Sequence, residues 1–289
     1  MLRPGMGGGG GSGVPRGVGA DYAHLAERIA DRGCTLGKPL HLEAEVSSTN
    51  DLAKDAARSG APHGTTFVAE AQTHGRGRQG RSWLASRGES ILVSVVLRVA
   101  CPVRRLPTLS LACGLAARDA IAKATRTVPM VKWPNDVWLD GKKVAGVLVE
   151  GLLQGDQANA IIVGVGINVH ARAFDPAIVA IATSVALHAR EEAPPERAVI
   201  LADLLAALDR DVGLVAARGV GLIHSRLTQY DALRGLRVHG DGDAPGDPGG
   251  VAEGIDLEGR LLVRRDDGAL ARFGAGEVHL ARGRSEAEG

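Results

Sequence analysis

Residues 131–150 read VKWPNDVWLDGKKVAGVLVE, two apolar runs separated by Asp140-Gly141. Asp-Gly between apolar runs is the strongest short-range indication of a two-residue β-hairpin, because both turn residues need positive φ. With these residues at the centre of the turn, Trp138 lies opposite Lys143. Since side chains alternate between the faces of a strand, Asp136, Trp138 and Lys143 then share one face. The stretch therefore predicts antiparallel strands that bring a carboxylate beside an ammonium group.

Pro134 interrupts the first apolar run, and a proline within a strand indicates an edge, a bulge or an irregular turn. Asn135 and Asp136 follow it, so their side chains can bind a cation or hydroxyl groups; a plain turn between strands is the alternative. Lys142 and Lys143 point to opposite faces, so only one of them can lie in a given site. A lysine beside a turn is usually just solvated, and this segment alone leaves both interpretations open.

Other strands and helices surround this hairpin. Apolar runs predict strands at 65–72, 90–99 and 159–169. Amphipathic patterns predict helices over 21–32, 103–125, 195–219 and 223–233, the third with a proline in its first turn. A further helix begins at Ser48, Thr49 or Asn50, each of which can cap it, and ends before Gly60.

The pattern changes after Gly235, where short strands alternate with Gly and Asp turns, as in a small β-barrel or sandwich. We therefore predict one domain over residues 20–234 and a second over 235–284, followed by a tail at 285–289. Residues 1–19 form a glycine-rich segment with little to bury, and we expect them to be disordered. Residues 240–250 are expected to form a long, mobile loop.

Composition excludes several classes of protein. The chain has 289 residues and a formal net charge of only +1, so it is not a polyelectrolyte built for nucleic acid. Cys34, Cys101 and Cys113 form no C-x-x-C pair, which argues against a disulfide framework or a zinc knuckle and fits a reducing cytoplasm. No apolar run approaches the length of a membrane span, and the N-terminus lacks the pattern of a signal peptide. We therefore expect a cytoplasmic protein without a membrane partner.

The segment HGRGRQGRSW at 74–83 concentrates positive charge, and no acidic residue occurs between Ala71 and Gly88. Its glycines let the backbone approach a ligand closely, and arginine forks suit phosphate or carboxylate. The segment is neither a Walker loop nor a dinucleotide fingerprint. Taken alone, an Arg-rich loop is more often solvated or RNA-binding, but the two predicted strands that flank it favour a site loop on a rigid scaffold.

Four motifs in this order, SSTN, EAQTHGRGRQGRSW, VKWPNDVWLDGKKVAGVLVE and VGVGINV, resemble those of the bacterial biotin protein ligases. The similarity runs from about residue 46 to residue 282, most of the chain. The resemblance implies an α/β (α+β) catalytic domain with a mixed sheet, of the type found in biotin and lipoate ligases and class II aminoacyl-tRNA synthetases. It also implies a small SH3-like β-barrel after that domain.

The resemblance further implies an enzyme that activates biotin with ATP and Mg²⁺ to give biotinyl-5′-AMP, without a tightly bound prosthetic group. Biotin then passes to one lysine of a biotin carboxyl carrier protein domain, as in acetyl-CoA carboxylase. For biotin, the matching positions are Ser48, Thr49, Asn50, Gln72, Gly75, Arg76, Gly77, Lys143, Gly164 and Gly166. For ATP or the adenylate, they are Arg78, Arg81, Trp83, Lys132, Asn135, Asp136 and Asn168. The implied catalytic residues are Lys143, Arg78 and Arg81, and the candidate Mg²⁺ ligand is Asp136.

The chemistry agrees with these positions. Attack of a carboxylate on an α-phosphorus brings two anions together, so positioning and cationic stabilisation supply most of the catalysis and no enzyme nucleophile is required. An acyl-adenylate hydrolyses when water enters, so a glycine-rich loop that folds over it can also act as a lid.

The chain also departs from the family pattern. About 45 residues precede the first motif, fewer than the winged-helix DNA-binding domain of many family members needs, so we expect a monomeric or homodimeric ligase that binds no DNA. Family members often carry an arginine directly after a segment like GEVHL, where this chain has Ala281 and then Arg282.

Two other functions compete with this one. A lipoate ligase shares the implied fold, but GRGRQG and KWPND have the forms that resemble biotin enzymes. An RNA-binding module would need stacking aromatic side chains, and only 3% of the residues are aromatic.

Overall fold

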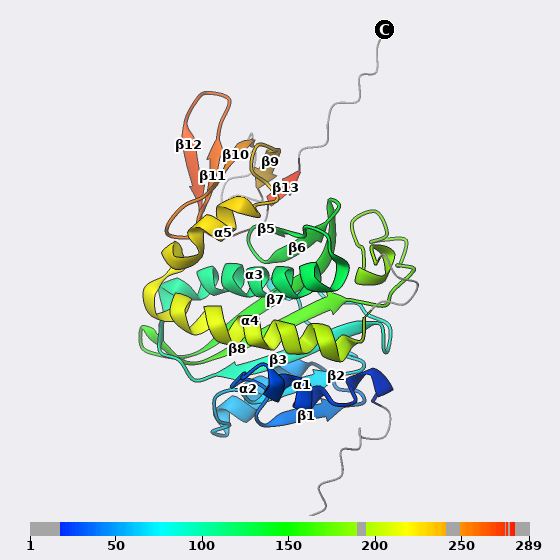
Figure 1. The fold of residues 1–289 in the computed structure, drawn as a ribbon. Coiled ribbons are helices and arrows are strands. Elements are labelled where there is room, and N and C mark those ends of the chain that lie inside the picture. The colour runs from blue at the N-terminus through cyan, green and yellow to red at the C-terminus, as the bar shows by residue number, and fades with distance from the viewer. Residues whose placement is uncertain (1–17, 190–194, 241–248, 275, 277, 281–289) are drawn as a thin grey trace, which may run out of the picture.

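The computed structural model describes residues 18–189, 195–240, 249–274, 276 and 278–280. These residues form two sheets and the helices that cover them (Figure 1). Residues 1–17 of the predicted N-terminal tail, residues 241–248 of the predicted loop, and the whole segment 281–289, with Ala281 and Arg282, lie outside the described residues.

The large sheet is eight-stranded, in the order β1-β2-β3-β8-β7-β6-β5, with β4 paired to β8. Its strands are β1 Leu40–Glu43, β2 Thr66–Ala69, β3 Ser90–Leu97, β4 Cys101–Pro102, β5 Met130–Lys132, β6 Asp136–Leu139, β7 Lys142–Gln154 and β8 Gln157–Asn168. β1 runs parallel to β2, and the other neighbours are antiparallel. The expected mixed sheet of an α/β fold is therefore confirmed.

The hairpin forms as its turn residues require. Asp140 and Gly141 have φ values of 49° and 75°, and Trp138 pairs with Lys143 as predicted. Of the alternatives at Pro134, the irregular turn is the one that forms: β5 and β6 are separate strands joined by a turn that contains a cis Trp133–Pro134 bond. The physical reason is that Pro134 has no N–H to donate to a ladder, so the chain turns there.

Five α-helices accompany the large sheet in the described residues. They are α1 Leu25–Asp31, α2 Thr49–Arg58, α3 Leu106–Thr125, α4 Arg197–Arg218 and α5 His224–Gln229. Ser48 is the N-cap of α2, as the sequence allowed, although its side chain makes no capping hydrogen bond. The N-cap of α4 is Glu196, so Pro195 lies just before the helix and not in its first turn as predicted. No helix among these residues is both long and apolar enough to cross a membrane.

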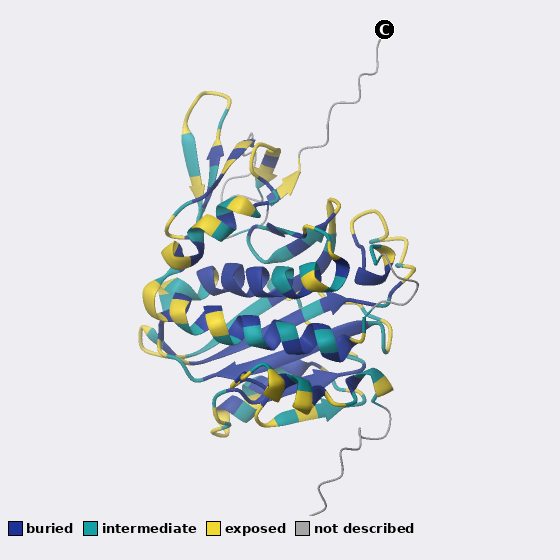
Figure 2. Ribbon diagram, viewed as in Figure 1, coloured by how far each residue is buried: buried dark blue, intermediate teal, exposed yellow. Residues whose placement is uncertain are grey.

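The two faces of the sheet are covered differently. The long helices α3 and α4 lie across one face (Figure 1), and on β8 that face consists of Ile161, Val163, Val165 and Ile167. These residues belong to the main buried core, which appears as the dark blue band in Figure 2. On the other face, Ala160 and Ile162 pack with Ala53 and Ala57 of the short helix α2. Because side chains alternate between the two faces of a strand, Gly164, Gly166 and Asn168 of β8 also lie on that second face.

The C-terminal sheet has five antiparallel strands in the order β12-β11-β10-β9-β13. The strands are β9 Arg237–Gly240, β10 Gly250–Ile255, β11 Leu261–Arg264, β12 Leu270–Phe273 and β13 Val278–Leu280. The indole N–H of Trp133 donates to the carbonyl of Gly259 at 3.1 Å, which ties this sheet to the turn between β5 and β6. The small β unit expected after Gly235 is therefore present and shares the main core; the domain boundary itself stays a prediction.

Candidate functional site

Polar residues at the N-terminus of α2 form one end of the candidate site. The backbone N–H and hydroxyl of Thr49 donate to Gln72 Oε1 at 2.7 and 3.1 Å. The hydroxyl of Ser94 donates to Asn50 Oδ1 at 2.5 Å, and its oxygen lies 2.8 Å from Thr49 Oγ1. Ser48 Oγ is buried and has no hydrogen-bond partner among the described residues. A ligand hydrogen bond would satisfy that hydroxyl.

The Arg-Gly loop, residues 74–88, folds back on itself beside these residues. Gly77 N donates to Arg81 O at 2.7 Å, and Trp83 N donates to Gly75 O at 2.9 Å. The tip is a short 3₁₀ turn over Arg78–Gly80. A cavity of about 390 Å³ is lined by residues 72–77 and 80–85. The loop lies between β2 and β3, as its flanking strands predicted, and its role as a site loop stays a prediction.

Glycines on the second face of the sheet let other groups approach closely. A Cβ added to Gly166 would lie 2.5 Å from Trp83 Cε2, and one added to Gly146 would lie 2.9 Å from Trp83 Cζ3. A Cβ at Gly164 would collide with the Asn50 side chain. The indole of Trp83 therefore lies directly against the backbone of Gly146 and Gly166, and a larger residue at either position would displace the ring.

Cationic side chains converge at the other end of this face. Lys143 Nζ is 2.7 Å from Asp136 Oδ1 and 5.5 Å from the centroid of the Trp83 ring. Lys132 Nζ lies 5.3 Å from the centroid of the Trp138 ring. The predicted pairing of carboxylate and ammonium groups is therefore confirmed.

Arg78 reaches the same place from the Arg-Gly loop, where its guanidinium donates to Asn135 Oδ1 at 3.2 Å. Asn135 Nδ2 in turn donates to the carbonyl of Val147 at 2.8 Å. The turn between β5 and β6 is thereby joined both to the loop and to β7.

Burial and neighbouring positive charges disfavour the charged forms of two cations in this cluster. Burial lowers the pKa of Lys132; Asp136 opposes the shift, while Lys143 and Arg81 add to it. Burial also lowers the pKa of Arg78, with Asp136 opposing and Arg81 adding. A depressed pKa means that the charged form costs free energy in the folded protein. An anionic ligand would offset that cost, so the cluster can bind phosphate or carboxylate.

Asn168 lies on the same face but is held by the protein. Its Nδ2 donates to Thr183 O at 3.0 Å, and its Oδ1 accepts from Ser90 Oγ at 3.4 Å. Its predicted contact with a nucleotide stays a prediction.

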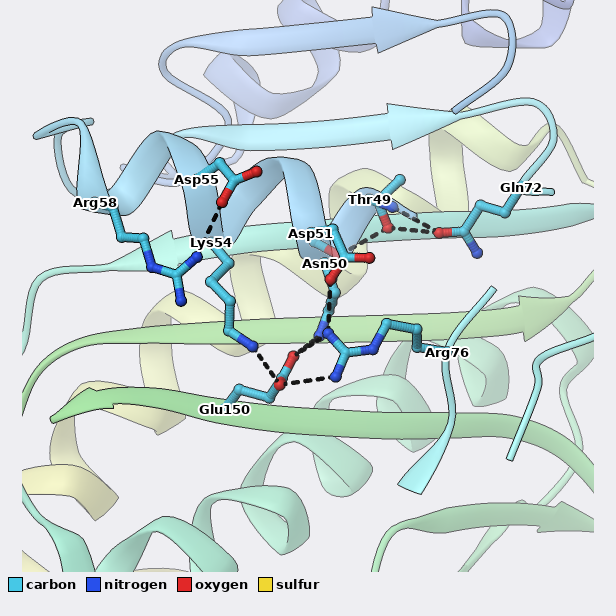
Figure 3. Close-up of polar contacts among 10 residues, drawn as sticks. Thr49, Asn50, Asp51, Lys54, Asp55, Arg58, Gln72, Arg76 and Glu150 are labelled. Carbon is cyan, nitrogen blue, oxygen red and sulfur yellow. Dashed lines mark hydrogen bonds and ion pairs between the residues drawn. The ribbon is translucent and has the colours of Figure 1, made fainter. Parts of the chain in front are cut away.

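Four residues that the sequence did not single out also contribute to the site: Asp51, Lys54, Ser94 and Glu150. Figure 3 shows Glu150 of β7 at the meeting point of Asn50, Lys54 and Arg76. A single acid in the apolar run VAGVLVEG was the available signal, but the sequence alone does not say what faces it.

Comparison with known proteins identifies the relatives of this chain. A model of the biotin/lipoate A/B protein ligase family matches residues 43–168, and a model of the biotin protein ligase C-terminal domain matches residues 246–280. The bifunctional ligase/repressor BirA of Bacillus subtilis is 32% identical over 242 residues, covering 83% of this chain and 74% of the relative. The biotin–[acetyl-CoA-carboxylase] ligase of Mycobacterium tuberculosis is 33% identical, covering 84% of this chain and 90% of the relative.

A solved structure agrees with these relatives. The biotin protein ligase from Aquifex aeolicus in complex with biotin and ATP superimposes with a TM-score of 0.70 at 28% identity. The match covers 84% of this chain and 99% of that one.

Proposed function

The chain belongs to the biotin/lipoate A/B protein ligase family, and from that membership we propose that it is a biotin–protein ligase. It is an ATP-dependent ligase. In the proposed reaction it activates biotin to biotinyl-5′-AMP and transfers biotin to a specific lysine of a biotin carboxyl carrier protein domain.

One observation carries this proposal. A polar pocket end, formed by Ser48, Thr49 and Gln72, and a cationic end, formed around Lys143, lie along a single glycine-lined face of the sheet. Biotin has a polar head group at one end and a carboxylate at the other, joined by an apolar chain. The arrangement of the face suits a molecule of that kind, because its middle offers backbone and the Trp83 ring rather than charge.

In the first step, a carboxylate oxygen of biotin attacks the α-phosphorus of ATP. The bond from that phosphorus to the bridging oxygen breaks, and pyrophosphate leaves. We assign Lys143 to the biotin carboxylate and the α-phosphate, because its ammonium group stands beside Trp83 and Gly146. Arg78, Arg81 and Lys132 would stabilise the charge on the phosphoryl oxygens.

In the second step, the ε-amine of the acceptor lysine attacks the acyl carbon of the adenylate. The amide bond forms, the amine loses a proton, and AMP leaves. Between the steps the Arg-Gly loop would exclude water from the intermediate, and Gly75, Arg76 and Gly77 would lie against biotin.

Asp136 is the residue that would hold Mg²⁺. Mg²⁺ in such sites is usually held by one or two carboxylates together with substrate phosphates and water, so a single aspartate fits. Among the described residues there is no group of three or more His, Cys, Asp or Glu side chains that could hold a metal ion. When bound, Mg²⁺ neutralises charge on the phosphate oxygens.

A direct experiment tests the proposal. The protein is incubated with ATP, Mg²⁺ and either biotin or lipoate, with and without a biotin carboxyl carrier domain, and the products are measured by mass spectrometry. We expect biotinyl-AMP and a biotinylated acceptor lysine in the biotin reactions alone. Lipoyl-AMP in place of biotinyl-AMP would instead make the chain a lipoate ligase.

A further inference from the structure

Glu150 has no part in the chemistry proposed above, yet three segments meet at its carboxylate (Figure 3). Its Oε1 accepts from Lys54 Nζ at 2.7 Å and from Arg76 Nη2 at 3.1 Å. Its Oε2 accepts from Asn50 Nδ2 at 3.1 Å and from Arg76 Nη1 at 3.2 Å. Asn50 and Lys54 belong to α2, Arg76 belongs to the Arg-Gly loop, and Glu150 itself belongs to β7. One carboxylate therefore joins a helix, a loop and the sheet.

The contact with Arg76 is specific in its geometry. Two parallel N–H···O bonds to one carboxylate fix the plane of a guanidinium as well as its position. Arg76 Nη1 also donates to Asp51 Oδ1 at 2.7 Å, so the loop is bound to α2 from two sides. The Glu150 side chain is 19% exposed against 44% for Asp51, so water weakens its contacts less.

The charge of Glu150 is well compensated. Burial raises the pKa of its carboxyl, but the hydrogen bonds from Lys54 and Asn50 and the charge of Arg76 outweigh burial and hold the pKa below its usual value. The carboxylate is therefore ionised at neutral pH.

The residues that Glu150 holds are those that would face biotin. Asn50 accepts from Ser94 Oγ through Oδ1 while it donates to Glu150 through Nδ2, so the two contacts together fix the orientation of its amide. Arg76 lies between Gly75 and Gly77 in the part of the loop that we assign to biotin. Asn50 of α2 and Arg76 of the Arg-Gly loop are thus both bound to the carboxylate of Glu150.

We propose that Glu150 is a positioning residue for the biotin site: it holds the Arg-Gly loop on α2 and orients Asn50 before ligand binds. The choice of biotin as the ligand rests on the proposed function, whereas the closure of the loop does not. A loop that is already in place loses less conformational entropy on binding, so its ligand binds more tightly and leaves more slowly. Without the carboxylate of Glu150, the loop opens more often.

The test compares Glu150→Gln with the matched control Asp203→Asn. Asp203 is a similarly buried carboxylate, 13% exposed, that accepts from Arg32 and Lys123, an arginine and a lysine, and it lies on α4, which covers the opposite face of the sheet. Limited trypsin digestion without ligand reports loop opening directly, because the loop contains Arg76, Arg78, Arg81 and Arg87. We expect cleavage in the loop to be about tenfold faster in Glu150→Gln, the size expected for losing charge-assisted hydrogen bonds, and unchanged in Asp203→Asn.

Kinetics give a second readout that a purely structural role would not move. In Glu150→Gln we expect the KM for biotin and the release rate of the adenylate to rise about tenfold, with kcat at saturating biotin within about twofold of the parent. Arg76→Lys keeps the charge but cannot form the bidentate contact, so it should open the loop to trypsin in the same way. As Arg76 is 37% exposed, this variant tests the contact even where Glu150→Gln does not fold.

If Glu150→Gln folds and trypsin cleaves its loop at the parental rate, the proposal is overturned. If Glu150→Gln does not fold, a parental cleavage rate in Arg76→Lys overturns it instead. An equal loss of kcat in Glu150→Gln and Asp203→Asn would do so as well. The proposed function fails separately: wild-type protein that makes no biotinyl-AMP would refute it, while the trypsin comparison would still decide whether Glu150 holds the loop.

Discussion

The two faces of the large sheet are built from the same strands and differ in almost every other property. On β8, one face presents Ile161, Val163, Val165 and Ile167 to the core under α3 and α4. The other face begins with Ala160 and Ile162 under α2 and then presents Gly164 and Gly166, which carry no side chain at all. Because alternate residues point to opposite faces, a single strand can supply both a core and a site.

Under the proposed function, stability and binding depend on different faces of the sheet. Apolar area buried under the long helices stabilises the fold, since α3 alone contributes Leu109, Leu111, Leu115 and Ile121 as fully buried side chains. The other face instead holds polar and cationic groups, and the Trp83 ring and the Asn50 side chain lie against its glycines. Substitutions on the two faces should therefore affect different measurements.

The largest effect on function is expected from Lys143→Ala. Removing this ammonium group takes away a charge that would stabilise the developing phosphoryl charge, so adenylate formation should fall about a hundred- to a thousandfold. The fold should persist, because the Lys143 side chain is 34% exposed and does not belong to the core. Pyrophosphate release and thermal unfolding, measured on the same sample, test both statements; near-parental adenylation would remove Lys143 from the catalytic role.

On the opposite face, Ile161→Ala should act on stability. Ile161 is fully buried in the main core, so the cavity left behind should lower the free energy of unfolding by about 2–5 kcal/mol. Urea titration measures that loss. The KM for biotin, measured well below the unfolding transition, should stay near that of the parent; a large rise in KM would mean that the two faces are coupled.

Arg78→Gly probes the loop that covers the site face. Arg78 donates to Asn135 across the site, and we expect its loss to release the adenylate about tenfold faster. The free intermediate should then acylate lysines of bystander proteins, which mass spectrometry detects. Retention of the adenylate equal to that of the parent would argue against a lid role for this arginine.

The smallest effect is expected from Lys132→Met, which should stabilise the protein while lowering its activity. Burial depresses the pKa of Lys132, so its protonated form costs folding free energy at neutral pH. Methionine keeps the length without the charge, and we expect a gain of about 1 kcal/mol at pH 7.

The lowered pKa of Lys132 also determines how the stability difference between the two proteins changes with pH. Since the folded pKa lies below the unfolded value, wild-type stability should rise with pH as the lysine deprotonates. The advantage of the variant should therefore shrink as the pH approaches 10.5, the ordinary pKa of lysine. Thermal unfolding of both proteins from pH 7 to pH 10 measures it. An advantage that is absent at pH 7 would mean that Lys132 carries no such cost.

Local features of the chain were predicted correctly because their causes are local. Asp140-Gly141 can adopt positive φ at both positions, and this alone fixes the hairpin and the pairing of Trp138 with Lys143. Apolar periodicity likewise located α3 and α4, although the cap of α4 is Glu196 and Pro195 lies outside the helix.

The sequence left alternatives open where distant segments decide the outcome. At Pro134 the irregular turn is the alternative that forms, and there Asn135 exchanges hydrogen bonds with Val147 through its side chain and its carbonyl. These contacts with β7 stabilise the turn at Pro134 and separate β5 from β6. Pro134 indicated an edge, a bulge or an irregular turn, but the choice among these depends on contacts with β7 that lie outside residues 130–139.

The sequence by itself determined the hairpin, the glycines of the site face, the order of the motifs and the family that they resemble. Only the tertiary structure decided which arginine meets which partner: Arg76 binds Asp51 and Glu150, 25 and 74 residues away, whereas Arg78 binds Asn135. The physical reason is that turn chemistry and periodicity act between neighbours in the chain. Ion pairs across a sheet depend on strand register and helix placement, which exist only once the chain has folded.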